Sequence, residues 1–148
     1  MLISTKGQYA LEAVLDLALK PEGSCESLKD LAQRREISES YLEQIFIKLR
    51  RHGIVKSVRG INGGYRLARN PAQITAGQVI RALEGPFKPV LCLTKTKKQC
   101  ARYPQCITRR VWERIESELD SVADSITLKM LADKFNELYS GKILNYQI

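Results

Sequence analysis

The sequence has few of the residues that most enzymes use in catalysis. It contains one histidine and one tryptophan, and no glycine-rich motif of the type that binds nucleotides. It also lacks the run of about 18 apolar residues that a membrane-spanning helix needs. Its first residues do not form the basic and apolar segments of a signal peptide. We therefore expect a cytoplasmic protein that is not an enzyme and has no membrane partner.

Acidic residues are missing from a long central stretch. From Gln44 to Leu83 the chain has eight Lys or Arg residues and no Asp or Glu. A surface that serves only solubility mixes charges of both signs, so this stretch indicates a face that contacts phosphate groups. The chain of 148 residues has a formal charge of +8, which points to a polyanionic partner such as nucleic acid.

Three segments of the first half carry apolar residues at helical spacing. A first helix follows Ser4, a second covers residues 28–34, and a third, capped by Ser38, covers residues 39–51. Two short helices joined by a tight turn are typical of a helix-turn-helix motif. The pattern alone has low specificity, because other helical proteins share it.

Two β-branched segments follow the third helix. Residues 54–58 and 65–67 are separated by the glycine-rich and asparagine-containing segment 59–64, which favours a hairpin. A hairpin directly after a helix-turn-helix is a wing; the alternative is a basic hairpin in an unrelated α+β domain. The sequence therefore predicts a mainly α-helical fold with a small β wing, as a winged helix-turn-helix domain with a long dimerisation helix.

The second half divides into a loop and two helices. A helix capped by Thr75 ends near Leu83, and residues 85–106 form a loop with three of the four cysteines. A long helix is expected to begin at Pro104, where proline is favoured. Its apolar residues recur every three or four positions, which favours a homodimer seam over the alternative, an internal core face. These residues are Ile107, Val111, Ile115, Leu119, Val122 and Ile126.

We expect four segments in the chain. Residues 1–84 form the winged domain, 85–106 the cysteine loop and 107–126 the dimerisation helix. A last short helix is expected to fold back onto the winged domain within residues 127–140, because its apolar residues again follow a helical period.

Several motifs resemble one family of regulators. They are Ser4-Thr5-Lys6-Gly7-Gln8-Tyr9-Ala10, Ile37-Ser38-Glu39-Ser40-Tyr41-Leu42-Glu43-Gln44, Leu49-Arg50-Arg51-His52-Gly53-Ile54-Val55, Ser57-Val58-Arg59-Gly60, Gly63-Gly64-Tyr65 and Ile74-Thr75-Ala76-Gly77. Over residues 1 to about 135 the chain resembles the iron–sulfur cluster regulator (IscR) family, which includes nitric-oxide-sensing and cysteine-metabolism repressors. The resemblance implies a homodimer on a pseudo-palindromic double-stranded DNA operator. It also implies one [2Fe–2S] cluster per subunit and repression of genes for cluster assembly.

The second helix of a helix-turn-helix lies in the major groove of DNA, and a wing contacts the backbone or the minor groove. Glu43 is the exception among the basic and neutral residues, because its carboxylate either discriminates between bases or lies on a solvated surface near Lys48. The residues that we expect to contact DNA are Ser38, Ser40, Tyr41, Glu43, Gln44, Lys48, Arg50, Arg51, Lys56, Arg59, Gly63 and Tyr65.

Three thiols, those of Cys92, Cys100 and Cys106, lie within fifteen residues of a basic loop. Positive charge favours thiolates, which bind soft metals. The loop has no Cys-x2-Cys pair of zinc-ribbon type, whereas three cysteines and one further ligand hold a [2Fe–2S] cluster. The alternatives are a thiol redox switch, a different metal, or three cysteines by chance.

The fourth ligand is not evident. The cluster regulators have a histidine three residues after the third cysteine, where this chain has Arg109. The single histidine, His52, ends the third helix. Other branches of the family use the first helix of the partner subunit, at the positions that match Gln8 and Glu12, so these two residues are candidates for the fourth ligand. Cys25 is isolated and has no assigned role.

Overall fold

The computed structural model describes residues 1–94 and 100–146, with side chains described as far as residue 140. The chain order of its elements places a winged domain before two long helices. The elements are α1 (Thr5–Ala18), α2 (Leu28–Arg35), α3 (Glu39–Arg51), β1 (Val55–Val58), β2 (Gly64–Leu67), η1 (Pro71–Gln73), α4 (Ala76–Glu84), η2 (Leu91–Thr94), η3 (Tyr103–Gln105), α5 (Ile107–Ser125) and α6 (Leu128–Tyr146). The fold class is mainly α with a small β wing, as the sequence predicts.

Serine caps define the helix-turn-helix. The hydroxyl of Ser27 accepts the N–H of Asp30 at 3.1 Å and that of Ser38 accepts the N–H of Tyr41 at 3.2 Å, so both helices begin where the sequence predicts. Helix α2 ends at Arg35. The next residue, Glu36, adopts a left-handed conformation with φ 54°, which gives the tight turn into α3.

The wing is an antiparallel pair with Lys56 opposite Arg66 and Ser57 opposite Tyr65. Backbone bonds between Glu26 and Tyr65, at 2.8 and 2.9 Å, attach a third short segment beside β2. The wing is therefore joined directly to the chain that enters α2.

The recognition helix α3 is fixed by the apolar face it buries. Leu42, Ile45, Phe46 and Leu49 have no exposed surface and pack against Ala13 and other α1 residues in a single core. The ring of Phe46 meets the ring of Tyr65 edge-on with centroids 4.9 Å apart, so the same core also holds the wing.

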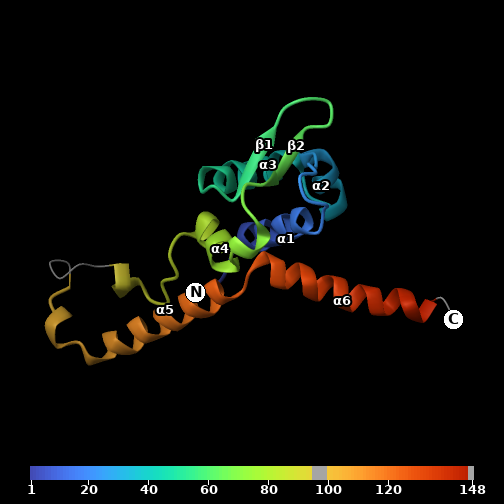
Figure 1. Cartoon of the computed structure of the whole chain (residues 1–148). Helices are drawn as coiled ribbons and strands as arrows, with labels where there is room; N and C mark the ends of the chain where they lie inside the picture. Colours follow the sequence, from blue (N-terminus) through green and yellow to red (C-terminus); the bar gives the residue numbers. More distant parts are fainter. Residues whose placement is uncertain (95–99, 147–148) are drawn as a thin grey trace.

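Helices α5 and α6 extend in opposite directions from a junction beneath α1 and α4 (Figure 1). At this junction the N–H of Leu128 donates to Ile74 at 2.9 Å and the N–H of Ala76 donates to Ile126 at 2.8 Å. No described helix is long and apolar enough to cross a membrane.

Two boundaries differ from the sequence prediction. Pro104 lies in η3, and α5 begins only at Ile107 because Cys106 is extended, with ψ 94°, and interrupts the helical path. The last helix is longer than a short return segment. Leu128 and Ala132 are buried against the winged domain, but the following side chains, from Asp133 to Ser140, are exposed.

A substitution of Phe46 tests whether the core holds α3. Phe46→Ala removes a ring with no exposed surface, and we expect the free energy of unfolding to fall by about 3–5 kcal/mol. The next residue, Ile47, is 39% exposed on the same helix, so Ile47→Ala is the control and is expected to cost about 1 kcal/mol or less. Urea unfolding followed by circular dichroism measures both. Equal losses would contradict this account of the core.

Candidate DNA-binding surface and cysteine loop

The outer face of α3 carries most of the polar residues predicted to contact DNA. Ser38, Ser40, Glu43, Gln44 and Lys48 are all exposed on this helix. Within the described residues Glu43 forms no ion pair with Lys48. The side chains that can read base edges are therefore presented together at the start of the helix and along one side of it.

Two predicted contact residues are partly engaged in packing. Tyr41 lies edge-on to Tyr9, with ring centroids 6.1 Å apart, and the ammonium of Lys6 lies 5.8 Å from the centre of the Tyr41 ring. Tyr65 packs on Phe46, and both tyrosines are half-buried. Their rings therefore help to position α3 and the wing.

Exposed cations surround this face. Arg50 and Arg51 end α3, Lys56 lies on β1 and Arg59 lies at the tip of the wing. Gly63 is half-buried at the tip, and a Cβ there would collide with the carbonyl oxygen of Val58. The tight tip therefore requires glycine at position 63.

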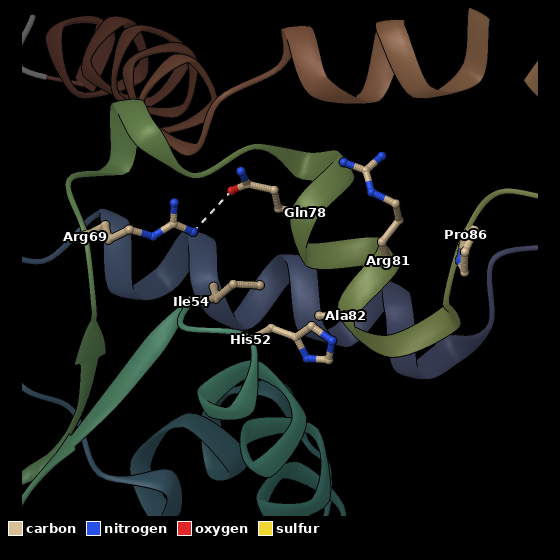
Figure 2. A pocket seen from close by; sticks show the side chains of 7 residues that line it. All are labelled: His52, Ile54, Arg69, Gln78, Arg81, Ala82 and Pro86. Atoms are coloured by element: carbon tan, nitrogen blue, oxygen red, sulfur yellow. Dashed lines mark hydrogen bonds between the residues drawn. The ribbon is translucent and has the colours of Figure 1, made fainter. Parts of the chain in front are cut away.

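A cleft of about 320 Å³ lies between the end of α3, the segment after β2 and α4 (Figure 2). Arg69 crosses this cleft and donates to the carbonyls of Gly53 at 3.3 Å and Gln73 at 3.2 Å, and to the side chain of Gln78 at 3.3 Å. Figure 2 shows the contact between Arg69 and Gln78, with His52 at the other side of the cleft. One guanidinium thus connects the end of the recognition helix to α4.

The cysteines frame the loop between α4 and α5. Cys92 lies in η2, Cys106 is the residue before α5, and Cys100 precedes η3; all three are half-buried free thiols. Residues 95–99, with Lys95, Lys97 and Lys98, lie outside the described residues.

Arg109 holds the two ends of this loop together. Its guanidinium donates to the carbonyl of Cys92 at 3.1 Å and to Glu113 at 2.8 Å. It also lies 4.2 Å from the centre of the Tyr103 ring, within the range of a cation–π contact. Its side chain is only 14% exposed. Arg109 therefore links η2, η3 and α5. The sequence alone marks it only as the residue at the position where the cluster regulators have a histidine.

The start of α5 also favours the ionised form of one thiol. The hydroxyl of Thr108, 3.4 Å from the sulfur of Cys106, lowers the pKa of that thiol, and the backbone N–H of Arg109 adds to the effect. Both groups stabilise negative charge on sulfur by hydrogen bonding, so Cys106 reaches the reactive thiolate form at a lower pH than an ordinary cysteine.

The described residues do not gather into a metal site. No group of three His, Cys, Asp or Glu residues among them has an arrangement that could hold a metal ion. The donor chemistry nevertheless fits a [2Fe–2S] cluster in part, because three thiols flank one loop beside a buried cation. Arg109 cannot complete the set, since a guanidinium has no lone pair to offer.

The two candidates for the fourth ligand lie on the exposed side of α1. Glu12 pairs with Arg35 at 3.2 Å and its side chain is 48% exposed. Gln8 is exposed and donates to the carbonyl of Ile3 at 3.2 Å. Neither has a recorded contact with the cysteine loop within the described chain. Cys25 is half-buried next to Glu26, beside the wing.

Sequence reasoning did not find the arginine links. Arg69 and Arg81 have no motif that marks them, because their partners lie up to 43 residues away in the chain. Arg81 donates from α4 to Asp120 of α5 at 2.7 Å and also pairs with Asp124. Only the acid-free stretch around them, which leaves them without local carboxylates, gives a hint that their partners are distant.

The fold and the exposed basic face define a winged helix-turn-helix protein that binds DNA. The profile of the Rrf2 family, described as "Iron-dependent Transcriptional regulator", matches residues 3–134. The chain therefore belongs to the Rrf2 family of DNA-binding transcription regulators.

Its relatives include two kinds of regulator. CymR of Bacillus subtilis is 45% identical over 132 residues, which are 89% of this chain and 90% of that protein. IscR of Aliivibrio salmonicida is 41% identical over 128 residues, covering 86% of this chain and 75% of that protein.

Solved structures of both kinds of regulator are also similar to this chain. The structure of B. subtilis CymR, described as the global cysteine regulator, matches with a TM-score of 0.74 and 42% identity over 90% of this chain and 98% of that one. The IscR of T. potens matches with a TM-score of 0.74 and 40% identity, over 93% and 90% of the two chains. The TM-scores are thus the same for the structure described as a global cysteine regulator and for the IscR structure.

The salt dependence of DNA binding tests the role of Lys48. If its ammonium contacts a phosphate, Lys48→Ala reduces the slope of log K against log salt concentration by about one, on any DNA sequence. Lys134→Ala removes an exposed cation from α6 and is the matched control. Fluorescence anisotropy with a labelled duplex at several salt concentrations measures the slopes. The same slope in wild type and Lys48→Ala would exclude this phosphate contact.

The pH dependence of alkylation tests the environment of Cys106. In metal-free protein with Cys25, Cys92 and Cys100 changed to serine, Thr108→Val removes the hydroxyl that stabilises the thiolate. The pKa of Cys106 then rises, so the midpoint of iodoacetamide reactivity moves to higher pH. Thr94→Val is the control, because the Thr94 hydroxyl donates to the carbonyl of Leu91 and forms no hydrogen bond with Cys106 among the described residues. An unchanged midpoint in Thr108→Val would refute the assignment.

Proposed function

We propose that this regulator senses iron–sulfur supply or oxidative stress through a [2Fe–2S] cluster, one per subunit, and represses genes for cluster assembly. Cys92, Cys100 and Cys106 would hold the cluster. The observation that carries the proposal is the single basic loop with three free thiols whose last member, Cys106, directly precedes α5. When bound, the cluster supplies a redox-active group that oxidants destroy and that depends on iron and sulfide.

The residues of the chain give this loop a route to the DNA-binding surface. Arg109 ties Cys92 to the first turn of α5. Arg81 ties α5 to α4, and Arg69 ties α4 to the end of α3. A change in the order of the loop therefore acts on the position of the recognition helix through packed helices and not through a flexible linker.

A homodimer completes the DNA-binding unit in this proposal. Helix α5 exposes an apolar stripe, with Ile107 74% exposed, Val111 50%, Ile115 39% and Val122 59%. Apolar side chains at this spacing pack well against a second copy of the same helix. Two copies of α3 would then meet two half-sites about one helical turn of DNA apart, on a pseudo-palindromic operator in the cytoplasm.

The fourth ligand would come from the partner subunit. Arg109 is not a ligand, and within the described residues the loop adds no other carboxylate or imidazole to its thiols. Glu12 is the stronger candidate because its carboxylate is anionic and exposed, and Gln8 is the second. To bind iron, Glu12 would have to exchange its ion pair with Arg35, which is a surface pair of low energy.

A second function, a thiol-based regulator of cysteine metabolism without a cluster, is favoured by a different observation. Thr108 lowers the pKa of Cys106, so this thiol is primed for oxidation. The similarity to the global cysteine regulator of B. subtilis supports this alternative. Both functions share the DNA-binding surface and differ only in what the loop binds.

Anaerobic reconstitution with iron and sulfide separates the two functions. We expect the wild type and Cys25→Ala to take up about two iron and two sulfide ions per subunit and to absorb visible light. The triple variant Cys92→Ala, Cys100→Ala, Cys106→Ala is expected to stay colourless. DNA binding by loaded and unloaded protein is then compared on sites selected from random duplexes.

The outcomes of these experiments decide between the two proposed functions. A wild type without acid-labile sulfide after reconstitution would rule out the cluster. DNA binding that changes on mild oxidation of this colourless protein, and not in the triple variant, would establish the thiol switch. Equal DNA binding by wild type and triple variant in every state would exclude both forms of sensing.

A further inference from the structure

A second cavity lies beside the base of the wing, away from the cysteine loop. It has a volume of about 500 Å³ and is formed by the end of α1, the turn 20–24, Lys56 of β1 and residues 66–71, which are the end of β2 and the segment that follows it. Neither the recognition helix nor the wing tip lines it. The cavity is within the size range of small-molecule sites in proteins.

Four cations line this cavity: Lys20, Lys56, Arg66 and Arg69. Glu22 is the only acid among its described lining residues. Lys20 is 3.6 Å from Glu26, and Arg69 is bound to carbonyl oxygens, so these two cations have partners. The other two, Lys56 and Arg66, have no acidic partner among the residues that the structure describes.

Arg66 carries an unsatisfied donor. Its Nε atom is buried and has no hydrogen-bond partner, and it is the only described side-chain atom in this state. A buried donor of a charged group without a partner costs about 1–3 kcal/mol or more, so proteins normally provide an acceptor. The described chain therefore leaves this guanidinium incompletely hydrogen-bonded.

Lys56 lies opposite Arg66 across the hairpin. The two residues are directly opposite in the β1–β2 register, so their side chains leave the same face of the sheet. Like charges at opposite positions repel each other and destabilise the pair. An anion between or beside them removes the repulsion and supplies an acceptor for the guanidinium.

We propose that this cavity binds a small organic oxyanion, a molecule with a carboxylate, phosphate or sulfate group. The oxyanion group would contact Arg66 and Lys56, since guanidinium and ammonium groups recognise such oxygens. The apolar lining, which includes Leu17, Leu67 and Pro71, accommodates a carbon skeleton. The site depends on neither the cluster nor the thiol switch.

Occupancy of the cavity has a direct structural consequence. Its lining joins the end of α1 to the base of the wing, the two parts that Glu26 and Tyr65 link by backbone bonds. A bound anion therefore fixes the wing relative to the helix bundle, and it gives the regulator an input separate from the cysteine loop.

Titration with inorganic sulfate and inorganic phosphate tests the site. Heteronuclear NMR on the full chain, at constant ionic strength set with sodium chloride, is expected to show saturable shifts at residues 20–24 and 66–71. Arg66→Gln is expected to weaken binding by about tenfold or more, since it removes the charged donor. Arg114→Gln, which removes a 79% exposed cation on α5, is the matched control and is expected to bind like wild type.

DNA binding by the same variants separates a free anion from a DNA phosphate. Absence of saturable shifts in wild type, or equal sulfate binding by wild type and Arg66→Gln, overturns the proposal. If Arg66→Gln has a lower affinity for DNA and the wild type binds no sulfate, the cavity contacts the DNA backbone. This result also overturns the proposal. If Arg66→Gln does not fold, sulfate titration of Lys56→Gln, at an exposed position, tests anion binding instead, and sulfate binding equal to that of the wild type overturns the proposal.

Discussion

The architecture depends on the close approach of α4 and α5. Gly77 lies in the first turn of α4, and a Cβ at this position would be 3.1 Å from the backbone carbon of Ala123 and closer still to the carboxylate of Asp124. A larger residue at this position would push Asp124 aside and force α5 away by a few tenths of an ångström. The neighbouring Thr75 donates to Asp124 at 3.1 Å, and Arg81 pairs with Asp120 and Asp124 from the next turn. The contact fixes where the long helix leaves the winged domain.

Ion pairing contributes little to the stability of this junction. The carboxylates of Asp120 and Asp124 are 42% and 45% exposed, and pairs at such positions are each worth about 1 kcal/mol or less. Helix α4 itself is held by its buried apolar side chains. Val79 belongs to the core of the winged domain, and a fully buried side chain of this size contributes about 1.5–3 kcal/mol. Core packing therefore fixes α4, and the pairs with Arg81 add a directional contact between α4 and α5.

Local signals in the sequence predict much of this fold, and contacts between distant segments explain the rest. Helix α3 begins and ends at the predicted residues, because Ser38 caps it and its apolar period is strong. The capping box of Thr75 and Gln78 also forms as expected. The predicted start of α5 at Pro104 is wrong, because the extended conformation of Cys106 overrides the preference of proline for a helix start.

For the candidate site, the sequence predicts the cysteine loop and an exposed basic helix. It does not predict that Arg109 joins the ends of the loop, because this requires Cys92 and Tyr103 to be near in space.

The replacement of a histidine by Arg109 has a consequence for sensing under the proposed function. An imidazole at this position would be a ligand, whereas the guanidinium holds Cys92 and the start of α5 together by hydrogen bonds that need no metal. The two ends of the loop would therefore stay in place when no cluster is bound, and cluster occupancy would act on the link to the partner subunit. If Glu12 of α1 is the fourth ligand, cluster binding and dimerisation stabilise each other, since neither protomer has the full ligand set alone. The regulator would then respond to its own concentration as well as to the supply of iron and sulfide.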